Sequence, residues 1–271
     1  MNFVPFEFLD DVATTLQDLP LFSVFETTTG SYNVWEEAIE NERRIRQTFV
    51  LQFAFGCEDI RYSFRVGPLS LAFEDVKNLE KVQVQAICVR PLLPSGTSVD
   101  RSVFETMIDY IRPLMNCPKL KLQANVFDSI EFLNDIEFHE ITAGYSYSVG
   151  YSVPNSFLSK QFKTGFLQRC FVRPAGKWTK EFKENVEEFM TTQSFREIRL
   201  WNYVSKKLFG RLFRLTCDYE KKIYFNADFN VLEETEKLRR GENRAGVRVE
   251  LLEEGTLSYV MTIASDRAVK L

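Results

Sequence analysis

The chain has 271 residues, 45% of them hydrophobic and 27% charged, a composition typical of a globular protein with a buried core and not of a disordered chain. Its net charge of −4 lacks the basic excess that a nucleic-acid-binding protein needs to neutralise phosphates. No window approaches the roughly 18 uninterrupted apolar residues of a membrane span, so we expect neither nucleic acid nor a membrane as a partner.

Residues 1–46 are predicted to form a short helical module. Its first helix follows Pro5, a residue tolerated at a helix start because its missing N–H would be unpaired there. Apolar residues recur on one helical face, namely Phe8, Leu9, Val12, Ala13 and Leu16. A breaker at 27–31 precedes a further helical segment that carries Trp35.

Residues 47–271 are predicted to alternate between strands and helices. An antiparallel hairpin is expected first, over 48–55 and 61–66, and another last, over 247–252 and 257–263. The strands expected between the hairpins are 81–89, 119–124, 138–143, 167–172, 195–201 and 221–227. The helices expected among them are 103–111, 129–135, 156–163, 182–190 with Thr179 as N-cap, 205–214 and 232–240.

This alternation indicates an α/β fold with parallel pairing, because each strand needs a crossover before the next. Two architectures satisfy it: a doubly wound sheet, or an irregular curved array that resembles leucine-rich repeats. The spacing of the strands, near 27 residues, and the lack of a glycine-rich loop after any strand favour the array. The regular leucine-rich consensus itself is absent.

The sequence carries little that suggests catalysis, and we predict no catalytic residue, no metal site and no cofactor. A single histidine, His139, excludes metal sites built on several imidazoles, and it lies in a strand pattern typical of a structural side chain. A dyad of His139 with a cysteine is the alternative that the sequence leaves open. The phosphate-binding GxxxxGK[ST] and GxGxxG loops and the GxSxG nucleophile elbow do not occur.

The cysteines are odd in number, widely spaced and without a CxxC pair, which predicts free thiols in a reducing compartment, the cytoplasm or the nucleus. They are Cys57, Cys88, Cys117, Cys170 and Cys217.

Several aromatic residues stand where a binding surface could use them, although core packing is the more common fate of such residues. They are Tyr145, Tyr147, Tyr151, Trp178, Trp201 and Tyr203. The basic runs at 43–46 and 237–240 have acidic neighbours and are interpreted as solvated helix faces.

The N-terminus resembles the F-box, which begins with a Leu-Pro pair and a Glu and continues with apolar residues at helical spacing. The matching positions are Val4, Pro5, Phe6, Glu7, Phe8, Leu9, Val12, Ala13, Leu16, Val24 and Trp35. The stretch 27–31, Thr-Thr-Thr-Gly-Ser, departs from the second half of that motif. The whole chain looks like a nematode-expanded group that joins such a start to an irregular array with Phe-rich units such as 187–190.

This resemblance implies the substrate-recognition subunit of a cullin-type ubiquitin ligase, in which the N-terminal helices dock into a small helical adaptor and the array captures a protein target. The residues that it assigns to adaptor binding are Val4, Pro5, Phe8, Leu9, Val12, Leu16 and Trp35. Two alternatives remain at this point: packing of these side chains against the chain's own hairpin, and a stand-alone interaction or scaffold protein without a ligase role.

Overall fold

The computed structural model describes most of the chain beyond the N-terminal module. The described residues are 47–56, 59–79, 82–115, 118–123, 131–143, 152–174, 178–192, 194–215, 220–241, 247–253 and 258–264. The chain is mixed α/β and divides into two compact units, Met1–Ile87 with Leu92–Pro118 and Cys88–Pro91 with Lys119–Leu271. The expected division into 1–46 and 47–271 stays a prediction.

The first unit is built on an antiparallel hairpin, as the sequence predicted. β1 (Gln47–Phe55) pairs with β2 (Ile60–Val66), and β4 (Val82–Val89) lies on the other side of β1. β2 also pairs with two short strands, β3 (Leu69–Leu71) and β5 (Thr97–Val99).

Two α-helices complete the described part of this unit: α3 (Phe73–Lys77) and α4 (Arg101–Ile111), which is followed by a 3-10 turn at Arg112–Leu114. Aromatic side chains pack between the helices and the strands. The Phe53 and Phe104 rings meet with centroids 5.3 Å apart, and those of Phe64 and Phe73 stack at 6.3 Å.

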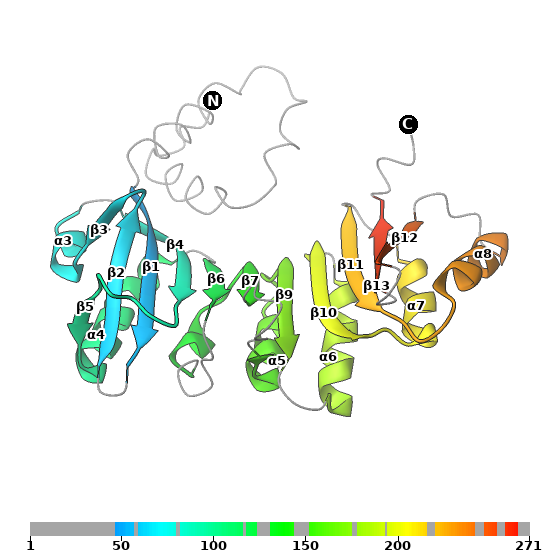
Figure 1. The fold of residues 1–271 in the computed structure, drawn as a ribbon, viewed down its shortest axis with the longest axis horizontal. Helices are drawn as coiled ribbons and strands as arrows, with labels where there is room; N and C mark the ends of the chain where they lie inside the picture. The colour runs from blue at the N-terminus through cyan, green and yellow to red at the C-terminus, as the bar shows by residue number, and fades with distance from the viewer. Residues whose placement is uncertain are drawn as a thin grey trace, which may run out of the picture. The chain divides into compact units, whose positions relative to one another are not determined.

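The second unit contains a run of parallel strands in sequential order: β6 (Lys119–Leu122), β7 (Glu140–Ala143), β9 (Arg169–Pro174), β10 (Glu197–Tyr203) and β11 (Lys221–Asn226). Each pairs with the next along the chain, so the order shows no reversal of the kind found in a doubly wound sheet (Figure 1). The antiparallel hairpin β12 (Val247–Glu253) and β13 (Ser258–Ile263) ends the run, with β13 beside β11.

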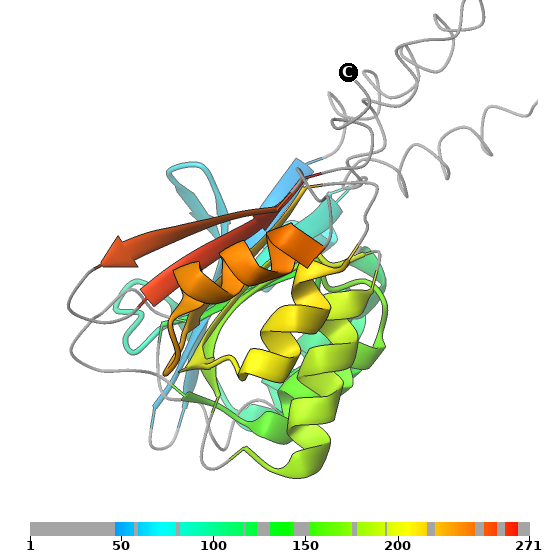
Figure 2. The same ribbon diagram turned by 90° about the vertical axis from the view of Figure 1, so that its right-hand side faces the viewer.

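The helices of this unit gather on one face of these strands (Figure 2). They are α5 (Asn155–Lys163), α6 (Lys180–Thr191), α7 (Lys206–Phe213) and α8 (Val231–Gly241). The predicted helix at 129–135 is described from residue 131 and is a 3-10 turn, Glu131–Asp135. A two-residue strand, β8 (Ser152–Val153), pairs with the end of β9.

A short polar residue starts most of these helices. The Thr179 hydroxyl accepts a hydrogen bond from the Phe182 N–H at 3.1 Å, which confirms the predicted N-cap. Ser205 caps α7 in the same way, and the Asn230 side chain accepts from the Glu233 N–H in α8. The cap fixes where each crossover turns from strand into helix.

Phenylalanines from the helices join them to each other and to the strands. The Phe162 ring of α5 stacks on Phe189 of α6 at 4.8 Å, and Phe189 contacts Phe195 at 5.4 Å. All three side chains are buried. None of the described helices is long and apolar enough to cross a membrane.

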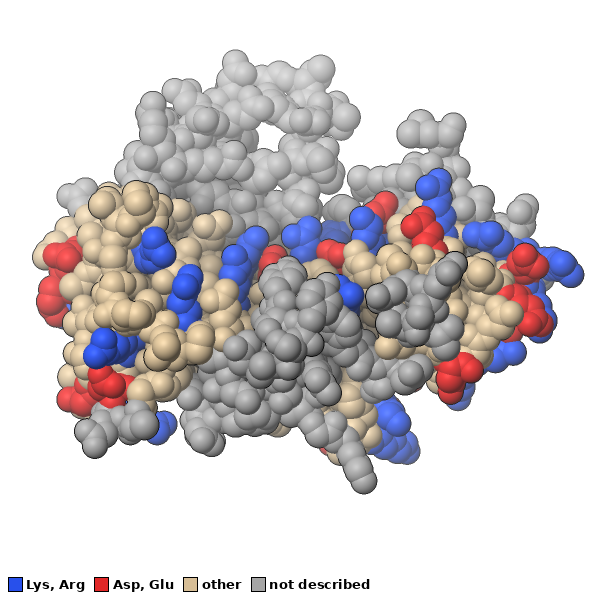
Figure 3. Space-filling model, in the orientation of Figure 1, with Lys and Arg blue, Asp and Glu red and all other residues tan. Residues whose placement is uncertain are grey.

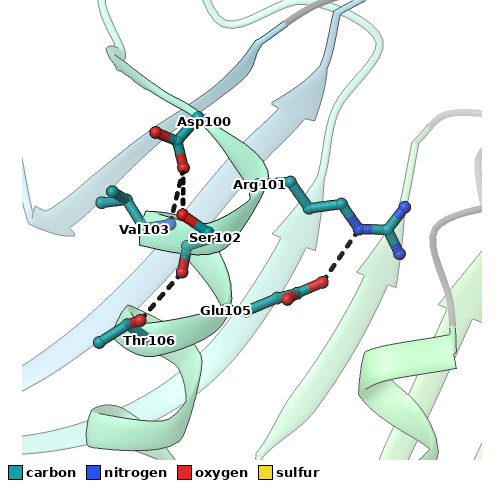
Figure 4. Close-up of polar contacts among 6 residues, drawn as sticks. All are labelled: Asp100, Arg101, Ser102, Val103, Glu105 and Thr106. Carbon is teal, nitrogen blue, oxygen red and sulfur yellow. Dashed lines mark hydrogen bonds and ion pairs between the residues drawn. The ribbon is translucent and has the colours of Figure 1, made fainter.

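Helix α4 yields a prediction about pH. The Asp100 carboxylate accepts hydrogen bonds from the Val103 N–H at 2.9 Å and the Ser102 hydroxyl at 2.8 Å (Figure 4), and these bonds lower its pKa. A carboxylate with a lowered folded-state pKa stabilises the fold above its unfolded pKa and loses that effect as the pH falls through the folded value.

Asp100→Asn keeps the cap but cannot titrate. We therefore expect the free energy of unfolding of this variant to fall less than that of the wild type when the pH is lowered from about 5 to about 2. Urea unfolding of both proteins across that range measures the difference. If the wild-type protein were more stable than Asp100→Asn by the same amount at every pH, the assignment would be wrong. Asp100→Ala, which removes the cap, should lower the urea midpoint at every pH above the folded-state pKa of Asp100.

The buried Gln161 amide yields a prediction about stability. It accepts a hydrogen bond from the Phe138 N–H at 3.2 Å and donates one to the Ile136 carbonyl at 2.9 Å. Gln161→Leu leaves both backbone groups without their partner, so we expect the free energy of unfolding to fall by about 2 kcal/mol. Gln123→Leu, at an exposed position of the same unit, is the control and should change it by less than about 0.5 kcal/mol.

Candidate protein-binding face

The side chains of the parallel strands alternate between two environments. Buried apolar residues face the helices, and they include Leu120, Ile141, Cys170, Ile198 and Ile223. The residues before and after each of them are half-buried or exposed and lie on the opposite face. Because β6, β7, β9, β10 and β11 pair in register as far as Arg199 and Tyr224, these outward side chains fall into rows that run across the sheet.

The first row, which we call the charged row, alternates in sign. It consists of Lys119, Glu140, Arg169, Glu197 and Lys222, each paired in register with the next. The Glu140 carboxylate lies 3.4 Å from the Lys119 ammonium and 3.7 Å from the Arg169 guanidinium, which is also 3.8 Å from Glu197. Figure 3 shows acidic and basic atoms beside each other on this side of the unit.

Lys222, the last member of the charged row, has a partner outside it. Its ammonium lies 3.2 Å from the Glu220 carboxylate, and this hydrogen bond raises the pKa of Lys222. The charged row with Glu220 is thus a set of mutually compensated ions.

The second row, which we call the aromatic row, consists of Lys121, Thr142, Phe171, Arg199 and Tyr224. The Arg199 guanidinium lies over the Tyr224 ring, 5.6 Å from its centroid, and the Phe171 and Tyr224 rings are 6.4 Å apart. Burial raises the pKa of Tyr224, and a hydrogen bond from its hydroxyl to the Glu197 carboxylate raises it further. This bond ties the two rows together.

None of the residues assigned to adaptor binding lies in the described part of the chain. Val4, Pro5, Phe8, Leu9, Val12, Leu16 and Trp35 all fall within 1–46, as does the basic run at 43–46. The Gly/Tyr/Ser segment 144–150, with Tyr145 and Tyr147, and Tyr151 also lie outside the described residues.

The remaining residues singled out from the sequence lie in helices and strands or directly beside them. Trp178 packs edge-on against Phe182, with centroids 5.1 Å apart, at the start of α6. Trp201 and Tyr203 lie at the end of β10, as expected from the sequence. The run 237–240 is on α8, where Lys237 pairs with Glu233 and Arg240 with Glu236, as a solvated helix face would.

His139 precedes β7, and its main chain has a repeated structural role. Its carbonyl accepts hydrogen bonds from the N–H groups of Gln168 and Arg169, and the Gln168 carbonyl does the same for Arg196 and Glu197. The Lys222 N–H donates the equivalent bond to the Arg196 carbonyl. The His139 carbonyl therefore occupies one position in a main-chain hydrogen-bond pattern that repeats from strand to strand.

The two described cysteines have the environment of core residues. Cys88 and Cys170 are both buried, and loss of hydration raises the pKa of each thiol. Among the residues that the structure describes, no three His, Cys, Asp or Glu side chains are placed to hold a metal ion.

No protein-family model, no curated protein and no solved structure matches this chain.

Sequence reasoning missed the aromatic row. Phe171, Arg199 and Tyr224 belong to three different strands, and only the register of the sheet brings them together. The signal that could have found them is the repeated alternation of one apolar and one polar residue within each strand.

The charged row generates a stability prediction. The Glu140 side chain is only 15% exposed and lies near two cations, so Glu140→Gln should lower the free energy of unfolding by about 1 kcal/mol. The difference in the free energy of unfolding between the wild type and Glu140→Gln should narrow as salt is added. Glu184→Gln removes a 63% exposed carboxylate with one partner, Lys180, and should cost no more than about 0.5 kcal/mol. Equal effects of the two substitutions in urea unfolding would show that the row is not a network.

Proposed function

We propose that this chain is a protein–protein interaction adaptor whose second unit captures a protein target on the outward face of its parallel strands. The observation that carries the proposal is the pair of in-register rows, which present half-buried aromatic and charged side chains on the face opposite the helices. Tyr and Arg dominate the binding energy of many protein interfaces, and both occur in the aromatic row.

The architecture supports the same proposal. In the second unit, consecutive described strands lie side by side and helices α5 to α8 lie on one face, an arrangement that supports our proposal of an irregular array resembling leucine-rich repeats. Arrays of this kind offer an extended surface of strands, and stacking of neighbouring units keeps it rigid. A rigid surface loses little conformational entropy when a partner binds.

We further propose that the adaptor serves a cullin-type ubiquitin ligase and that it acts in the cytoplasm or the nucleus. The support is the F-box-like series from Val4 to Leu16, whose apolar residues recur on one helical face. A short helical module gains stability when a partner covers such a face, and a small helical adaptor would do so. In this proposal the chain binds and positions a target, and the catalytic step belongs to other subunits.

Co-purification with ligase subunits tests the ligase role. We expect the tagged full chain to recover the small helical adaptor and a cullin from cell extract, and Leu9→Asp to reduce that recovery about tenfold or more, because a carboxylate in an apolar groove is strongly unfavourable. Leu92→Asp is the matched control, since the Leu92 side chain is already 76% exposed, and it should leave recovery unchanged.

A Leu9→Asp protein that recovers the adaptor as well as the wild type does would refute the docking claim. A wild-type chain that is stable and monodisperse and recovers no ligase subunit would favour the stand-alone interaction protein. The departure of residues 27–31 from the F-box pattern is the feature that motivates this alternative.

A further inference from the structure

We propose that strand β12 pairs with β12 of a second copy of this chain, so that the two sheets join antiparallel about a two-fold axis at Val249. This inference goes beyond the proposed function and does not depend on it. The segment that takes part is 247–251, over which β12 pairs regularly with β13 before the register shifts after Leu251.

Strand β12 lies at the end of the sheet order and has one neighbour among the described strands, β13. An edge strand presents a row of main-chain N–H and C=O groups to any second strand. The short strands of the first unit, β3 and β5, have three residues each, a length that discourages such pairing. Strand β12 has seven residues and contains neither proline nor lysine, two residues that commonly protect an edge.

The side chains of β12 divide between the two faces of the sheet. Val249 lies opposite Met261 of β13, which in turn lies opposite Ile223 of β11, so Val249 shares the face that the helices cover. Arg248 and Glu250 occupy the other face and are exposed. The edge therefore carries one cation and one anion, two residues apart, on its outward side.

Both charges lie opposite uncharged residues of β13. Arg248 is opposite Thr262, and Glu250 is opposite Val260. Opposite charges that face each other across paired strands are stabilising, and like charges are destabilising. A second strand that places Glu opposite Arg248 and Arg opposite Glu250 therefore complements this edge.

Strand β12 is itself such a strand. In an antiparallel pair centred on Val249, Arg248 of each copy lies opposite Glu250 of the other, and the two-fold axis relates the two ion pairs. A centre at Arg248 or at Glu250 would place like charges opposite each other, and a parallel pair in register would do the same. A centre between two residues would set helix-facing side chains opposite outward ones.

The apolar side of the strand fits the same register. Leu251 is 39% exposed, although Tyr259 opposite it on β13 is only 6% exposed. In the pair centred on Val249, Leu251 lies opposite Val247 of the second copy, so the apolar layer continues from one sheet into the other. Arg239 of α8 donates a hydrogen bond to the Val247 carbonyl at 2.8 Å and anchors the start of the strand, and a carbonyl oxygen can accept a second bond.

The dimer would place the outward faces of both copies on the same side, because opposite residues of paired strands share a face. The interface involves few residues, so we expect weak association, with a dissociation constant of about 10 to 100 μM. A target with two binding sites would strengthen it through multivalent binding.

Sedimentation equilibrium of the full chain from about 1 to about 300 μM tests this inference. We expect monomer and dimer without larger species, since pairing through a single edge closes after two copies. Arg248→Glu and Glu250→Arg each place like charges opposite one another and should weaken dimerisation about tenfold or more. An equimolar mixture of the two variants should associate as tightly as the wild type, because each contact then pairs Glu with Arg. The double variant should do so by itself.

Matched charge reversals away from β12 are the controls. Arg101→Glu on α4 and Glu184→Arg on α6 change the net charge by the same amounts at exposed positions and should leave dimerisation unchanged. Thermal unfolding shows whether each variant is folded. If the reversals prevent folding, Val249→Cys carries the test: its thiols should join in an intermolecular disulfide on mild oxidation, since opposed residues have Cα atoms about 4.5–5.5 Å apart. The wild type, oxidised in the same way, should not form this dimer.

The inference is wrong if the chain stays monomeric throughout this range, if it forms open-ended assemblies, or if charge reversal has no effect. A dimer that the single reversals weaken and their mixture fails to restore has another register, which also overturns it. A monomeric chain from which Arg248→Glu releases some other protein would assign the edge to that partner instead. Leu9→Asp should leave dimerisation unchanged, so this inference and the ligase role can fail separately.

Discussion

The two-residue alternation of side chains along the parallel strands is the constraint on which the rest of the second unit depends. A strand that turns Leu120 or Ile198 towards the helices must turn its neighbours Lys121 and Arg199 towards the other face. A slip of one residue in any strand would bury charges beneath the helices and expose apolar side chains. The packing of the helices therefore fixes the register, and the register places the charged and aromatic rows. Stability and the proposed binding surface come from the same pattern.

One residue shows how strongly that pattern is enforced. Lys221 occupies an inward position at the start of β11 and is only 1% exposed. Its ammonium donates a hydrogen bond to the Thr192 carbonyl at the end of α6 and lies 5.2 Å from the centroid of the Phe195 ring. The negative end of a helix and an aromatic face are two environments that favour a buried cation. The strand keeps its register here because the position supplies both.

The sequence predicted the hairpins, the six principal strands between them and the main helices, because those segments are long enough for a period to be visible. Thr179 could be named as a cap from its place before the Phe182 to Met190 pattern. The shorter elements were missed: β3 and β5 have three residues each, and α3 has five. Such elements form because of tertiary contacts, as when the Phe73 N–H at the start of α3 donates to the Tyr62 hydroxyl. Gly67, with φ of 56°, makes the turn from β2 to β3, and one glycine gives no periodic signal.

The rows were beyond sequence reasoning for a related reason: neighbours across a sheet are separated by whole crossovers. Glu140 and Arg169, or Phe171 and Arg199, are nearly thirty residues apart and meet only when helix packing has set the register. The residues singled out from sequence alone, from Val4 to Trp35, form a local helical pattern and are the kind of signal that a single segment can carry. A surface assembled from one or two residues per strand has no such local signal.

The contacts between the charged row and the aromatic row have a consequence for binding. The ion pairs of the charged row and the Glu197–Tyr224 hydrogen bond restrict the outward side chains before any partner binds. Ordering a long side chain costs roughly 0.5–1.5 kcal/mol on association, and Arg199, which lies over the Tyr224 ring, has already lost part of that freedom. A row that is preorganised by its neighbour can discriminate by geometry as well as by charge. The compensated charged row thus contributes to recognition by keeping Tyr224 and Arg199 in place, even where its own ions are satisfied within the chain.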